Sequence, residues 1–147
     1  MDDMQRECVF CSRDERLDHL MIEICELSVS TLYLNKEQSH FGRCVVALNE
    51  HQRELFHLPE ETRAKLMEDI VRVAAAIEKA FLPDKINYAM YGDTMPHIHF
   101  HIVPKYKDGE NWGKAFEANP NRTYFHDEQY QAMIEKLMKY LELPYLS

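Results

Sequence analysis

The chain has 147 residues, 46% of them hydrophobic, and contains no apolar run near the roughly 18 residues that a membrane span requires. A chain of this size buries one core, so we expect a single domain over residues 1–147. The formal net charge of −8 argues against a long nucleic acid as partner, although a local basic pocket could hold a few phosphates. Residues 1–7 are polar and mostly acidic, unlike a secretory signal, so we expect a cytoplasmic protein without a membrane partner.

Runs of β-branched, aromatic and other apolar residues predict five strands, which we place at residues 21–27, 29–34, 43–48, 85–91 and 96–103. The polar stretch 35–41, followed by Gly42, predicts the turn that leads the chain into the third of these strands. The loop 92–95 is short, so we expect the last two strands to pair. The mixed composition of residues 50–58 predicts no particular structure.

Two further stretches have the apolar periodicity of amphipathic helices. The first begins at Pro59, has acidic residues in its first turn and ends before Pro83. Its apolar stripe consists of Leu66, Ile70, Val73, Ile77 and Phe81. The second helix is predicted over 127–143, after a polar and aromatic stretch, 105–121, that we expect to form a loop folded over another part of the molecule. Strands in an antiparallel sheet with helices on a face give an α+β fold.

Three histidines alternate with apolar residues in the last predicted strand, at His97, His99 and His101. Successive side chains of a strand point to opposite faces, so the three imidazoles share one face and the apolar residues between them pack on the other. Imidazole suits metal ligation, proton transfer and nucleophilic attack near neutral pH. The pattern therefore favours an enzyme site over a strand whose exposed face happens to carry histidines. Lys105 and Lys107 follow closely and could hold phosphate.

The chain has four cysteines, of which Cys8 and Cys11 form a CxxC pair. Such a pair is half of a tetrahedral zinc site, and His51 and the triad are natural suppliers of the missing ligands. A redox pair would need a helix N-terminus after a strand to lower the thiol pKa, and two free thiols are the remaining alternative. Cys25 and Cys44 lie in apolar strands, where we expect them to behave as core hydrophobes.

Other motifs for nucleotide chemistry are missing from the sequence. The glycines never form a phosphate-binding array, so an anion must be held by side chains, and no GxSxG elbow supplies a serine nucleophile. Isolated histidines are usually surface or hydrogen-bonded residues. We therefore expect four histidines to lie outside the site: His19, His40, His57 and His126.

The run 96–104, PHIHFHIVP, resembles the signature of the histidine-triad (HIT) superfamily of nucleotidyl hydrolases and transferases. The order of the CxxC pair, the 42–48 segment leading into His51, the long helix and the triad strand is similar to that of zinc-containing bacterial members. The resemblance spans residues 8–107. It implies a HIT-like fold and a homodimer.

The resemblance also implies roles for the triad. The middle histidine, His99, would attack the α-phosphorus of a nucleotide and form a covalent intermediate that water hydrolyses. His101 would donate hydrogen bonds to phosphate oxygens or assist the leaving group. For His99 to attack through one nitrogen, its other nitrogen should donate to a backbone carbonyl or a similar acceptor.

By the same resemblance, the first triad histidine belongs to a metal site. Cys8, Cys11, His51 and His97 would hold a structural zinc ion with no open position for water. A different possibility is a metallohydrolase in which all three triad histidines bind one catalytic metal.

Three residues depart from the usual family pattern at positions expected to bind the nucleotide. Asn35 replaces an aspartate that binds ribose hydroxyls, Arg43 replaces a histidine, and Asp93 replaces a glutamine. A carboxylate near a phosphate is unfavourable without a compensating cation such as Arg43. The implied substrates are dinucleoside polyphosphates or nucleoside phosphoramidates, and the alternative is a nucleotide-binding or regulatory module without catalysis.

Overall fold

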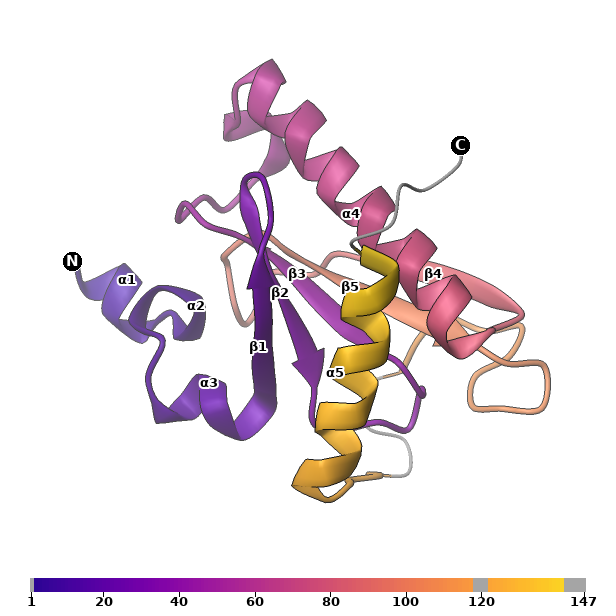
Figure 1. Cartoon of the computed structure of the whole chain (residues 1–147). Helices are drawn as coiled ribbons and strands as arrows, with labels where there is room; N and C mark the ends of the chain where they lie inside the picture. The colour runs from indigo at the N-terminus through magenta and orange to yellow at the C-terminus, as the bar shows by residue number, and fades with distance from the viewer. Residues whose placement is uncertain (1, 118–121, 142–147) are drawn as a thin grey trace.

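The computed structural model describes residues 2–117 and 122–141 and contains a five-stranded antiparallel sheet with helices packed against it (Figure 1). The strands are β1 (Met21–Glu26), β2 (Ser30–Asn35), β3 (Cys44–Leu48), β4 (Lys85–Ala89) and β5 (His99–Lys105). Their order in the sheet is β1-β2-β3-β5-β4, so β5 lies between β3 and β4. The α+β prediction and the pairing of the last two strands are confirmed.

One face of the sheet is covered by the two long helices, α4 (Glu60–Phe81) and α5 (Asp127–Leu141), which pack on each other (Figure 1). The predicted stripe of α4 faces the core, where Val73 and Ile77 are fully buried. The helix ends at Leu82 in the left-handed conformation, directly before Pro83. Cys44 is buried and Cys25 packs against this core, as expected. The predicted extension of the last helix over 142–143 lies outside the described residues.

Short helices, which the sequence analysis did not predict, cover part of the other face of the sheet. They are α1 (Asp3–Glu7), α2 (Val9–Ser12) and α3 (Glu15–Leu20), and a 3-10 turn, η1 (Leu55–His57), precedes α4. Phe10 and Leu17 from this region pack against Tyr33 and Val45 of the sheet in a second apolar cluster. Asp2 caps α1 by accepting a hydrogen bond of 2.8 Å from the backbone N–H of Gln5.

The triad strand begins later than predicted and extends further. His97 precedes β5, because Pro96 supplies no backbone N–H and the His97 N–H donates to the Met95 carbonyl at 2.8 Å. At the other end, Pro104 is accepted in β5 because the pairing with β3 ends at Ile102 and only β4 continues alongside.

None of the helices in the described part of the chain combines the length and the apolar character that crossing a bilayer requires.

Candidate active site

The three triad imidazoles lie on the sheet face that carries the short helices. The rings of His99 and His101 are 5.3 Å apart between centroids, and the apolar Ile98 and Ile102 are fully buried in the core of the other face. In the register with β3, His99 lies opposite Ala47 and His101 opposite Val45, whose small or branched side chains leave room for the rings. The period-2 pattern of the sequence therefore places the triad as expected.

The His99 ring has a defined tautomer. Its Nδ1 lies 2.6 Å from the backbone carbonyl of His97, which can only accept, so Nδ1 carries the proton and Nε2 carries the lone pair. Burial lowers the pKa of His99 below its usual value, and the neutral ring is therefore favoured. The Phe10 ring packs on it at 5.1 Å. The hydrogen bond from His99 Nδ1 to the His97 carbonyl is the backbone contact that we expected from the sequence, and it leaves Nε2 free for attack.

The surroundings of His101 also favour its neutral form. Burial, followed by the charge of Arg43 and the neighbouring His99, lowers the pKa of His101 to about 3. Its Nδ1 is buried and has no hydrogen-bond partner among the described residues. The ring instead contacts the ring of Phe116 at 5.5 Å between centroids. His101 thus presents an unpaired polar nitrogen beside the reactive ring of His99.

A cavity of about 310 Å³ opens over these rings. Its apolar lining comes from α2, α3 and the start of β1, through Val9, Phe10, Leu20 and Met21. Its polar lining includes Asn35, Glu37, Arg43, His99 and His101. Asn35 leaves its buried Oδ1 without a hydrogen-bond partner among the described residues. The cavity therefore joins an apolar surface to polar atoms that no described protein group satisfies, which is the form of a small-molecule site.

Several residues expected near the ligand lie elsewhere. Asp93 does not line this cavity and instead borders a separate hollow with Arg53 and Glu54. Lys105 was wrongly expected to serve phosphate, because its Nζ donates to the carbonyls of Asn111 and Lys114 at 2.6 and 3.0 Å. Lys107, expected in the same role, does not line the cavity either.

Other residues that line or border the cavity were not expected from the sequence. His19 was wrongly placed outside the site, since it lines the cavity from the end of α3. Glu37 was not considered, although it pairs with Arg43. Phe10 could have been found, because it lies between the two cysteines of the CxxC pair and must stay near them. The contributions of α3 carry no such sequence signal.

A second group of residues lies next to the triad. Cys8, Cys11, His51 and His97 each offer one ligand atom, and all four atoms lie within 4.8 Å of one another. The Nδ1 of His97 is 3.3 Å from Cys8 Sγ and 3.1 Å from His51 Nδ1. Bonds of about 2.0 to 2.3 Å from a tetrahedral ion would separate its ligands by roughly 3.3 to 3.8 Å. The spacing and the donor set therefore fit a bound metal ion.

Further contacts around this group suit a metal site. The Nε2 of His97 lies 2.6 Å from the Leu48 carbonyl, so Nε2 carries the proton and Nδ1 is free to be the ligand. Burial and the neighbouring Cys8 raise the pKa of the Cys11 thiol to about 12, so two adjacent thiolates need a cation to form. Because Nδ1 of His97 faces the cysteines and Nδ1 of His99 faces a carbonyl, the triad does not converge on one ion of its own.

Comparison with known proteins agrees with this geometry. The family model of the HIT domain matches residues 24–108, which is more than half of the chain. The protein therefore belongs to the HIT family, and the resemblance noted in its sequence is confirmed. Membership supports nucleotide hydrolase or transferase activity in general terms and a small nucleotide as the partner.

The individual relatives have low sequence identity to this chain. Adenosine 5'-monophosphoramidase hnt1 of Schizosaccharomyces pombe is 25% identical over 118 residues, covering 77% of this chain and 85% of that protein. The crystal structure of the histidine triad protein blr8122 from Bradyrhizobium japonicum aligns with a TM-score of 0.79 at 23% identity, over 87% of this chain and 96% of the other. A Zn-bound histidine triad family protein from Mycobacterium smegmatis aligns with a TM-score of 0.66 at 26% identity, over 92% and 96% of the two chains.

Proposed function

We propose that this protein is a nucleotide hydrolase or nucleotidyl transferase that acts at an α-phosphate through a covalent intermediate on His99. The observation that carries the proposal is the 2.6 Å contact between His99 Nδ1 and the His97 carbonyl. It leaves a neutral ring whose Nε2 lone pair is available at the wall of the cavity.

The cavity suggests how a nucleotide would bind. Its apolar lining, with the Phe10 ring, suits a flat base, and the unpaired Oδ1 of Asn35 can accept a hydrogen bond from a ribose hydroxyl. Arg43 and His101 line the same cavity, where they would meet the phosphates. With the nucleotide bound in this way, the α-phosphorus would lie near His99.

The reaction has two displacements. In the first, the Nε2 lone pair forms a bond to the α-phosphorus, and the bond from phosphorus to the leaving group breaks with its electron pair going to the leaving group. The proton stays on Nδ1, which donates a hydrogen bond to the His97 carbonyl, and this bond stabilises the cationic ring. In the second, a water oxygen attacks phosphorus, the P–N pair returns to Nε2, and one water proton is released with the nucleoside monophosphate.

We also propose that the metal group binds zinc through Cys8, Cys11, His51 and His97. The Zn-bound relative from Mycobacterium smegmatis and the ligand spacing support this assignment. An ion with four protein ligands has no open position, so its role is to tie the N-terminal helices to the start of the triad strand. The phosphorus chemistry stays with His99.

The homodimer and the cytoplasmic location remain predictions. The edge position of β4, with Tyr88 exposed on it, is compatible with pairing to a second copy.

The test is a rapid-quench experiment with diadenosine triphosphate labelled at the α-phosphate. We expect an acid-labile adenylyl group on His99 in the wild type, and a loss of turnover of more than about 10³-fold in His99→Ala with nucleotide binding retained. His57→Ala is the matched control, because His57 is an exposed histidine outside the cavity. Wild-type rates in His99→Ala would refute the nucleophile, and binding without any adduct in the wild type would identify a binding module instead.

A further inference from the structure

We propose that Arg43 makes this site selective for substrates whose leaving group is a phosphate, such as dinucleoside polyphosphates, over nucleoside phosphoramidates, whose leaving group is an amine. The proposal rests on the proposed nucleotidyl chemistry and decides between the two substrate classes that it leaves open.

Arg43 is a buried cation with unused donors. It is only 5% exposed, and its Nε and Nη1 make no hydrogen bond to any residue in the described ranges. Its backbone carbonyl accepts a hydrogen bond of 3.2 Å from the Asn35 N–H, which fixes the residue at the cavity floor. Unsatisfied buried donors are costly, and those of a guanidinium match the oxygens of a phosphate. The side chain therefore has the properties of a phosphate receptor.

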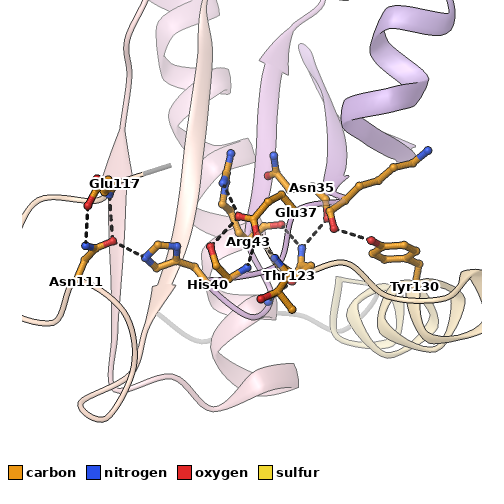
Figure 2. Close-up of polar contacts among 12 residues, drawn as sticks. Asn35, Glu37, His40, Arg43, Asn111, Glu117, Thr123 and Tyr130 are labelled. Carbon is orange, nitrogen blue, oxygen red and sulfur yellow. Dashed lines mark hydrogen bonds and ion pairs between the residues drawn. The ribbon is translucent and has the colours of Figure 1, made fainter. Parts of the chain in front are cut away.

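Glu37 forms an ion pair with Arg43 but no hydrogen bond of ordinary length to its guanidinium (Figure 2). Its carboxylate accepts hydrogen bonds from the Ser39 N–H at 2.9 Å, the Ser39 hydroxyl at 2.7 Å and the Thr123 N–H at 2.7 Å. The nearest Arg43 nitrogen, Nη1, is 3.7 Å away, which is beyond the roughly 3.2 Å of an ordinary N–H···O bond. The pair thus lowers the cost of burying the charge, while Nε and Nη1 keep no hydrogen-bond acceptor among the described residues.

Arg43 lies beside His101, and we infer that the leaving group departs along this side of the cavity. The guanidinium carbon is 4.9 Å from the centre of the Phe116 ring, and the same ring contacts His101. His101 in turn neighbours the proposed nucleophile, His99. One aromatic side chain therefore contacts both Arg43 and His101 and holds them on the same side of His99.

The chemistry of bond cleavage favours a phosphate over an amine as the leaving group at this position. An amine leaves only after it gains a proton, and the lowered pKa of about 3 keeps His101 at neutral pH in its uncharged form, which is a poor proton donor. When the bond from the α-phosphorus to a bridging oxygen breaks, that oxygen keeps the electron pair and leaves as part of an anionic phosphate. The Arg43 donors can stabilise this charge directly.

The test compares two substrates on the full chain: diadenosine triphosphate and adenosine 5'-phosphoramidate. We expect kcat/KM of the wild type to be roughly 10- to 100-fold higher for the polyphosphate, the range of one charge-assisted hydrogen bond. Arg43→Gln should lose most of that advantage, because its loss on the polyphosphate should exceed its loss on the phosphoramidate by about the same factor. Arg16→Gln is the matched control, because Arg16 is an exposed arginine paired with Asp14.

Equal or faster turnover of the phosphoramidate by the wild type would overturn the proposal, and so would an equal loss on both substrates in Arg43→Gln. If Arg43→Gln does not fold, Arg43→Lys keeps the charge opposite Glu37 and should show a smaller loss confined to the polyphosphate. An equal loss on both substrates in Arg43→Lys counts against the proposal as well. Failure of the nucleotidyl chemistry itself is distinguishable, because neither substrate would then be consumed and no adduct would form.

Discussion

Replacing Asp69 with alanine should destabilise the fold strongly, because this carboxylate ties α4 to the turn between β1 and β2. Asp69 is 1% exposed and accepts hydrogen bonds from the backbone N–H groups of Ser28 and Val29 at 3.1 and 3.0 Å. It also accepts a bond of 2.6 Å from the Ser30 hydroxyl. The substitution leaves the two N–H groups without an acceptor, whereas the hydroxyl can rotate toward another partner.

Each partly buried N–H left unpaired costs about 1 to 3 kcal/mol, so Asp69→Ala should lower the free energy of unfolding by about 4 kcal/mol. Urea unfolding followed by circular dichroism measures this value from the midpoint and slope. Asp69→Asn keeps one acceptor oxygen and should lose about half as much. Glu78→Ala, at an exposed position of the same helix, should stay within about 0.5 kcal/mol of wild type. A loss below about 1 kcal/mol in Asp69→Ala would show that this carboxylate does not anchor the turn.

Two further predictions concern the metal and the pH dependence. The double variant Cys8→Ser and Cys11→Ser should lose the bound zinc, whereas Cys25→Ser should keep it; metal analysis that finds a full equivalent in the double variant would exclude this ligand set. Attack needs an uncharged His99, and its lowered pKa means that kcat/KM should stay level as the pH falls through about 6.5, the usual histidine value, and decline only at lower pH. A decline centred at or above that value in a pH–rate profile would contradict the buried, neutral nucleophile.

The low pKa of His101 also bears on stability. The unfolded ring takes up a proton near pH 6.5, whereas the folded ring resists protonation until about pH 3. Between these values the unfolded state binds more protons, so the contribution of this group is fully present above the unfolded pKa and is lost as the pH falls toward the folded one. The same sign holds for His99.

Local patterns were enough to define the strands, the two long helices and the triad. Alternation in a strand sends His99 and His101 to one face and Ile98 to the other whatever the rest of the chain does, since successive Cβ atoms point to opposite sides. The spacing of apolar residues likewise determined which face of α4 enters the core. These features depend only on residues close together in the chain.

The walls of the site were decided by the tertiary structure. Packing brings Cys8 to within 3.3 Å of His97, 89 positions along the chain, and sets α2 and α3 over the triad without a periodic signal in their short sequences. It turns the Lys105 ammonium toward carbonyls six and nine positions further along the chain, and it fixes the Glu37 carboxylate beside Arg43 through the Thr123 N–H, 86 positions away. Which buried charges are paired therefore depends on how the loops fold and on contacts between distant segments, and the local sequence pattern encodes neither.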